Sequence, residues 1–113
     1  MFGCSKRRNN FTFHVAEGHC FPEVYFDVTM EGQVTHQIGK NLERSFFKFM
    51  HKWDKWHRYS IRYICLDKIF EETSTVRIAV DFGWCKPKIV KALVKHMRKS
   101  SLPITSVLMH SED

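Results

Sequence analysis

The spacing of apolar residues changes along the chain in an order that strongly constrains the fold. Residues 11–16 (FTFHVA) and 23–30 (EVYFDVTM) alternate apolar and polar side chains, which is typical of strands with one buried face. We expect these two strands to pair, as a hairpin or side by side. From about Gln37 to residue 59 the apolar spacing becomes three and four, which predicts an amphipathic helix.

The second half of the chain repeats this change of period. Residues 61–67 and 75–82 have strand composition, and the polar segment between them predicts a hairpin connection. Residues 86–100 predict a second helix, with Pro87 near its first turn and Pro103 beyond its end. Residues 104–109 (ITSVLM) predict a last strand.

The resulting order is ββαββαβ. If the first strand is an accessory, the remainder reads βαββαβ, which predicts an α+β fold: a ferredoxin-like antiparallel sheet with two helices on one face. We divide the chain into a flexible basic tail, residues 1–10, and a single α+β domain, residues 11–113. Ten Phe and three Trp supply ample material for one core.

Composition also excludes several classes of protein. No run of apolar residues reaches the roughly 18 needed for a membrane span, and the first residues lack the apolar region of a secretory signal. We therefore expect a cytoplasmic protein that does not bind membranes. No two of the four cysteines are spaced as CxxC, which favours free thiols. His14, His19 and Cys20 lie close together in sequence, but no second pair with metal-ligand spacing follows them. No metal or other cofactor is expected.

The first predicted helix contains more large apolar side chains than its core stripe requires. Its stripe assigns Phe46, Phe49, Met50 and Trp53 to the core, against the sheet. The residues that this interpretation explains least are Phe47, which lies off the stripe, and Trp56, which lies near its edge.

Positive charge is concentrated on the two predicted helices. The strand regions, residues 1–35 and 61–85, each carry a net charge of −1, from three basic and four acidic residues. Residues 36–60 and residues 86–113 each hold six Lys and Arg against two acids, a net of +4. The whole excess of +6 therefore comes from the two helical regions.

Basic residues on each helix recur at a spacing of three and four, opposite the apolar stripe. Two such stripes side by side repel one another unless an anion offsets them, and nucleic-acid phosphate is the anion we expect. The alternative is a pair of solvated helix faces. The residues that we expect to contact nucleic acid are Arg44, Lys48, Lys52, Lys55, Trp56, Arg58, Lys88, Lys91, Lys95, Arg98 and Lys99.

A different class of function is also compatible with the composition. A compact basic chain rich in aromatic residues suits an inhibitor or adaptor that docks on an acidic or nucleic-acid-binding surface of a partner protein, of the kind that small viral genomes encode. The open face of the predicted sheet, with Tyr25 on it, is covered either by the first strand or by a second subunit in a homodimer. That face lacks a second aromatic residue on the other central strand for stacking RNA bases.

Catalysis has less support in the sequence. A small nuclease would need histidines or carboxylates that converge on a phosphate, and the candidates are His14, Glu17 and His19, or a metal-binding pair of Asp27 and Asp81. Pairing of such acids with Arg62 or Arg77 is the commoner arrangement. The sequence contains no glycine-rich phosphate loop and no GxSxG or HExxH motif, so we expect a binding protein and not an enzyme.

Overall fold

The structure is a computed structural model, and it describes residues 10–16, 23–57, 61–83 and 87–111. Its elements follow the predicted order, with one short 3-10 helix added between the third and fourth strands. They are β1 (Thr12–Val15), β2 (Glu23–Met30), α1 (His36–His57), β3 (Tyr63–Phe70), η1 (Glu71–Thr73), β4 (Thr75–Asp81), α2 (Pro87–Arg98) and β5 (Ile104–His110).

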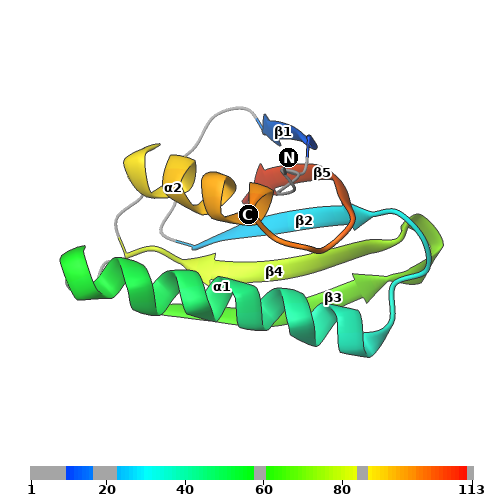
Figure 1. The fold of residues 1–113 in the computed structure, drawn as a ribbon, viewed down its shortest axis with the longest axis horizontal. Helices are drawn as coiled ribbons and strands as arrows, with labels where there is room; N and C mark the ends of the chain where they lie inside the picture. The colour runs from blue at the N-terminus through cyan, green and yellow to red at the C-terminus, as the bar shows by residue number, and fades with distance from the viewer. Residues whose placement is uncertain (1–9, 17–22, 58–60, 84–86, 112–113) are drawn as a thin grey trace, which may run out of the picture.

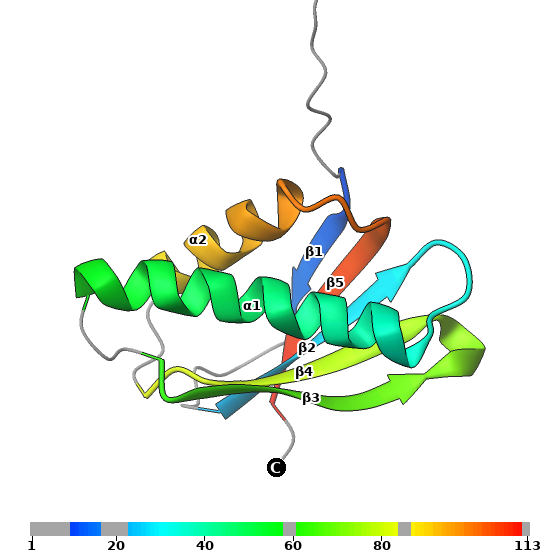
Figure 2. The ribbon, with the colours of Figure 1, turned by 60° about the horizontal axis from the view of Figure 1, so that its bottom comes forward.

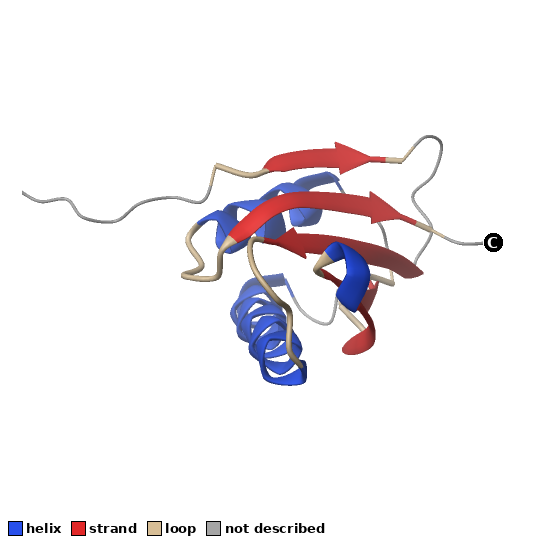
Figure 3. Cartoon of the chain, turned by 90° about the vertical axis from the view of Figure 1, so that its right-hand side faces the viewer, coloured by secondary structure: helices blue, strands red, loops and turns tan. Residues whose placement is uncertain are grey.

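The described elements form an α+β fold with one five-stranded sheet and two α-helices. The strand order is β1-β5-β2-β4-β3 (Figure 1). Both helices lie on the same side of the sheet (Figure 2), and Figure 3 shows the long helix α1 nearly end-on beside the strands. α1 lies toward the β3 edge and α2 toward the β1 edge.

Two predictions about the sheet are wrong. The sheet is mixed and not purely antiparallel, because β1 pairs with β5 in parallel, whereas all the other neighbours are antiparallel. β1 and β2 do not pair. The physical reason is that β4 and β5 occupy both edges of β2, so β1 can join the sheet only at an outer edge, and it does so beyond β5. For the same reason β1 lies at an edge and does not cover the open face.

The core lies between the sheet and the two helices. The side chains of β2 alternate as predicted, and every second residue from Val24 to Met30 is buried. Phe26 is fully buried and makes edge-on ring contacts with Phe46 of α1, at 5.7 Å between centroids, and with Phe82, at 6.2 Å. These contacts link β2 to the long helix and to the end of β4.

α1 begins and packs as local sequence rules require. Thr35 precedes its first residue, and its Oγ1 accepts a hydrogen bond from the N–H of Ile38 at 3.2 Å, which is an N-cap. Gly39 lets the helix approach β3 closely, since a Cβ there would meet Cδ1 of Ile69 at 3.1 Å. The side of α1 that carries Glu43 therefore faces β3, which leaves its opposite side toward α2.

The core prediction for α1 holds in part. Phe46 and Phe49 are buried as predicted, whereas Met50, Trp53 and Phe47 are only partly buried against the core. Trp53 packs against the core, but it is not fully buried between helix and sheet as expected. Its ring stacks on Phe49 at 5.8 Å and borders the space between the two helices.

The third strand is longer than predicted. It continues to Phe70 through a register shift between Leu66 and Lys68, so the predicted polar connection begins only at η1. Apart from Asn10, the predicted basic tail lies outside the described residues. No helix in the described part of the chain is long and apolar enough to cross a membrane.

Candidate nucleic-acid interface

α1 and α2 enclose a groove on the outer side of the helical layer. A hollow of about 410 Å³ opens between the middle of α1 and the C-terminal end of α2. A second hollow, of about 330 Å³, adjoins it, and the two share His96 and Lys99. We call the two together the helix groove, whose cationic residues are Arg44, Lys48, Lys52, Lys95 and Lys99.

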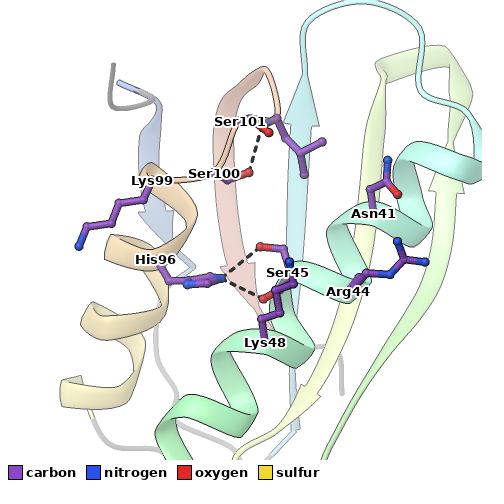
Figure 4. Close-up of a pocket in the computed structure, with 9 residues that line it drawn as sticks. Asn41, Arg44, Ser45, Lys48, His96, Lys99, Ser100 and Ser101 are labelled. Carbon is purple, nitrogen blue, oxygen red and sulfur yellow. Dashed lines mark hydrogen bonds between the residues drawn. The ribbon is translucent and has the colours of Figure 1, made fainter. Parts of the chain in front are cut away.

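The floor of the helix groove is polar at the point where the helices meet. Nε2 of His96 lies 2.9 Å from the backbone carbonyl oxygen of Ser45 and 3.2 Å from its hydroxyl (Figure 4). Because a carbonyl oxygen only accepts hydrogen bonds, Nε2 carries a proton and donates a hydrogen bond to the carbonyl oxygen of Ser45. This contact joins α2 to α1, and Ser100 adds a further hydroxyl at the C-terminal end of α2.

The cations of the larger hollow lie around this floor. In Figure 4 the side chains of Arg44 and Lys99 extend from α1 and α2 in opposite directions, away from the contact between His96 and Ser45. Lys48 and Lys99 are exposed, as are Arg44 and Lys52. The groove therefore combines a fixed polar floor with long cationic side chains that are free to turn toward a ligand.

The charge of the groove perturbs the histidine in its floor. Burial lowers the pKa of His96 below its ordinary value of 6.5, and the positive charges of Lys52, Lys48 and Lys99 lower it further. The hydrogen bond to Ser45 acts in the opposite direction. Burial is thus the main reason why the neutral form of His96 is favoured, and the cations that would attract an anion add to this effect.

The groove cations are not compensated within the described residues. The ion pairs there join Lys40 to Glu43, and Arg77 and His110 to Asp27, and none includes a cation of the helix groove. Clustered positive charges without acids raise the free energy of the folded chain and attract anions.

The structure places only some of the predicted contact residues at the helix groove. Five of them line the helix groove, as described above. Lys55 and Lys88 are exposed but line neither hollow, and Lys91 lies on the far side of α2, next to Phe13 of β1. The side chain of Trp56, and Arg58 as a whole, lie outside the described residues.

Arg98 was assigned to the interface by its spacing, but the structure places it elsewhere. Its Nη1 donates a hydrogen bond to the backbone carbonyl of Phe11 at 2.9 Å, and its guanidinium lies 4.2 Å from the centre of the Phe11 ring. These contacts attach the beginning of β1 to α2. Arg98 therefore has a structural role on the side of α2 that faces away from the groove.

The open face of the sheet carries a cluster that the sequence predicted only in part. Arg77 donates two hydrogen bonds to Asp27, at 2.8 and 3.1 Å, which confirms the expected pairing of these charges. Nε2 of His110 lies 2.9 Å from the second oxygen of Asp27. The Arg77 guanidinium also lies over the rings of Tyr25, at 5.3 Å, and Phe70, at 5.0 Å. The guanidinium is therefore engaged by neighbours on its own face.

Of the two arrangements considered for a nuclease, the structure tests only the pair of Asp27 and Asp81, and it does not bring them together. Asp27 and Asp81 do not face each other, because Asp27 pairs with Arg77 across the sheet, whereas Asp81 pairs with Glu23. The reason is the strand register, which places the two aspartates four residues apart along the sheet. His14 is exposed on β1, whereas Glu17 and His19 lie outside the described residues. No group of three or more metal-binding side chains occurs in the part of the chain that is described.

Of the four cysteines, the structure describes Cys65. Its thiol is free, and its side chain is exposed on β3. Partial burial raises the pKa of its thiol, and the nearby carboxylates of Asp67, Glu43 and Glu23 raise it further. Since the side chain is exposed, we assign most of this effect to the carboxylates.

Sequence reasoning missed the polar floor of the groove. Ser45 and His96 lie at the boundary between the apolar and basic stripes of their helices, which is the position that faces a neighbouring helix packed alongside. A polar residue at this boundary on both helices is the signal that could have identified them. Comparison of the chain with protein-family models, with curated proteins and with solved structures finds no match.

Proposed function

We propose that the protein is a small nucleic-acid-binding module that holds phosphate groups in the helix groove between α1 and α2. The observation that carries this proposal is the meeting of cations from both helices around one groove without an acidic partner among the described residues. The polar floor of Ser45 and His96 adds hydrogen-bonding groups to this charge.

Phosphate is the ligand that these side chains suit best. Arg44 can donate two hydrogen bonds to one phosphate, while the lysines act as mobile point charges. A chain of phosphodiesters presents negative charges at regular intervals, so it can engage both helices together. The engaged Arg77 on the open sheet face makes that side a poorer phosphate site.

The salt dependence of binding measures how many phosphates the groove contacts. Each phosphate contact contributes about 0.9 to the slope of log K against log salt for duplex DNA, and about 0.7 for single strands. If all five groove cations contact phosphates, the expected slope is roughly −4.5 for duplex and roughly −3.5 for single strands. Binding to random-sequence RNA and DNA, measured at several salt concentrations, gives this slope directly.

The test compares two triple variants with the same loss of charge. Lys48→Gln, Lys52→Gln and Lys99→Gln remove three groove cations, whereas Lys55→Gln, Lys88→Gln and Lys91→Gln remove three exposed cations that line neither part of the groove. Both changes should leave stability nearly unchanged, because exposed charges contribute fractions of a kcal/mol.

We expect the groove variant to bind more weakly and to flatten the slope by roughly two to three units, while the control variant changes the slope by less than one. Equal effects of the two variants would show that only total charge matters and would refute a groove site. Absence of any salt-sensitive binding by the parent protein would refute nucleic-acid binding altogether.

We also propose a finer assignment of the fold. The order β5-β2-β4-β3, with α1 following β2 and α2 following β4, supports a ferredoxin-like unit to which β1 has been added at the β5 edge. Hydrogen exchange tests this assignment. β1 should open at a lower free energy than β2 and β4, and opening of all five strands as one unit would contradict an added strand.

A further inference from the structure

The two edges of the sheet differ in how far other parts of the chain protect their backbone groups. An edge strand presents unpaired backbone N–H and C=O groups that can pair with another strand, and proteins usually cover or distort such edges. β3 forms one edge and β1 the other.

The β3 edge is protected. Its register shifts between Leu66 and Lys68, which interrupts the regular ladder. In addition, Oε2 of Glu43 in α1 accepts a hydrogen bond from the backbone N–H of Leu66 at 2.7 Å. A carboxylate and a bulge therefore occupy the positions where another strand would bind.

The β1 edge has less protection. The N–H of Ala16 bonds to Met109 of β5, so Thr12, His14 and Ala16 direct their backbone groups toward β5. Alternation along the strand then directs the N–H and C=O of Phe13 and Val15 outward. No group among the described residues bonds to these outward atoms. The outward carbonyl of Phe11 differs, because it accepts a hydrogen bond from Arg98.

An apolar hollow lies directly beside this edge. It has a volume of about 300 Å³ and is lined by Phe13 of β1 and by Val90 and Val94 of α2. The side chain of Val15 is 53% exposed. The rim of the hollow is cationic, because Lys91, Lys95 and Arg98 also line it.

We propose that the β1 edge and this hollow form a docking site for an extended peptide that presents both apolar and acidic side chains on one face. The peptide adds a sixth strand to the sheet by pairing with the outward groups of Phe13 and Val15. Its apolar side chains, which all point to one face, enter the hollow against Val90 and Val94. Its acidic side chains point to the same face, two residues away from the apolar ones, and meet Lys91 and Lys95.

Charge favours a peptide of this kind over a second copy of the chain. A copy that paired through its own β1 would bring its α2 cations next to those of the first, and the whole chain carries a net charge of +6. Like charges brought together oppose association, whereas an acidic strand neutralises the rim. The site lies on the other side of α2 from the helix groove and shares only Lys95 with it, so it does not depend on the proposed function.

The probe is a short blocked peptide with the repeat Val-Thr-Glu-Thr, so that valine and glutamate share one face, and the matched control has lysine in place of glutamate. The full chain is labelled with ¹⁵N, and amide shifts and hydrogen exchange are followed during each titration. We expect the valine-glutamate peptide to slow exchange of the Phe13 and Val15 amides and the valine-lysine peptide to bind at least tenfold more weakly. No binding, equal binding of both peptides, or changes confined to other elements would overturn the proposal.

Two variants distinguish strand pairing from nonspecific association with the peptide. Val15→Pro removes one outward N–H but no ladder hydrogen bond to β5, whereas Val15→Thr retains that N–H and a similar shape. We expect the proline variant to lose the peptide and the threonine variant to retain it. Equal binding by two folded variants would refute strand addition.

Lys91→Glu keeps the test decisive if Val15→Pro does not fold, because Lys91 is exposed. This change should weaken binding of the acidic peptide roughly fivefold and strengthen binding of the basic one. An unchanged preference would refute the charge rule. Sedimentation without peptide adds one more outcome, since a dimer abolished by Val15→Pro would assign the edge to a second copy instead.

Discussion

His96 connects the charge of the helix groove to the stability of the fold. Burial and the neighbouring lysines lower its pKa below the ordinary value of 6.5, so the folded chain resists protonation at this site more than the unfolded chain does. Between the two pKa values the unfolded state binds more protons. The free energy of unfolding should therefore be fully retained above about pH 6.5 and should fall as the pH is lowered through that window.

The size of the effect follows from proton counting. One proton bound by the unfolded state and not by the folded state gives a slope of at most about 1.4 kcal/mol per pH unit. The variant His96→Gln cannot titrate, and its side-chain N–H can still reach the carbonyl of Ser45. We expect this variant to lose its share of the slope below about pH 6.5 while it keeps most of the stability at about pH 8.

The assay is chemical denaturation at a series of pH values from about pH 8 to about pH 5, with His51→Gln as the matched control. His51 is exposed on α1 and lines neither hollow, so its replacement also removes one imidazole but leaves the groove intact. The control should follow the parent protein. Identical pH dependence of the parent and His96→Gln would refute the assigned role of His96.

An anion in the groove should reverse part of this perturbation. Sulfate keeps its double charge across this pH range, so it can offset Lys52, Lys48 and Lys99 without titrating itself. We expect sulfate to raise the pKa of His96, followed through its ring protons by NMR, relative to chloride at the same ionic strength. Equal pKa values in the two salts would show that the anion does not bind near His96.

Three further predictions concern the fold. Phe46→Ala should cost roughly 3 to 5 kcal/mol because its ring is fully buried, whereas Trp53→Ala should cost roughly 1 to 3 kcal/mol because that ring is only partly buried; equal losses of melting temperature would contradict this order. Cys65 should alkylate more slowly than free cysteine at about pH 8, and Asp67→Asn should accelerate its alkylation. An unchanged rate in this variant would show that Asp67 does not raise the pKa of the thiol. Asp27→Asn should destabilise the chain by roughly 1 to 3 kcal/mol and leave nucleic-acid binding unchanged, and weaker binding would place the interface on the open sheet face.

The element order was predictable because apolar periodicity reports which face of each element is buried. β2 shows this clearly, since its alternating residues are all buried on one side. Pairing partners were not predictable in the same way. The parallel pairing of β1 with β5 depends on which strand edges remain free after the other four strands have assembled, and that is a property of the whole sheet.

The candidate site was predictable in its charge but not in its geometry. Spacing identified basic stripes on α1 and α2, yet it could not tell which side of each helix faces its neighbour. Lys99 and Arg98 are adjacent in sequence, and the structure places one in the groove and the other against Phe11. Lys48 lines the groove, whereas Lys55 lines neither of its hollows. The packing angle of the helices decides these assignments.

The most direct test of the helix groove is a map of amide shifts during titration of the ¹⁵N-labelled chain with a random-sequence oligonucleotide. The groove predicts shifts that cluster at Ser45, His96 and Ser100 and on the facing turns of α1 and α2, and that disappear as salt is raised. Shifts centred instead on Tyr25 and Ala79 of the open sheet face, or no shifts at low salt, would contradict it.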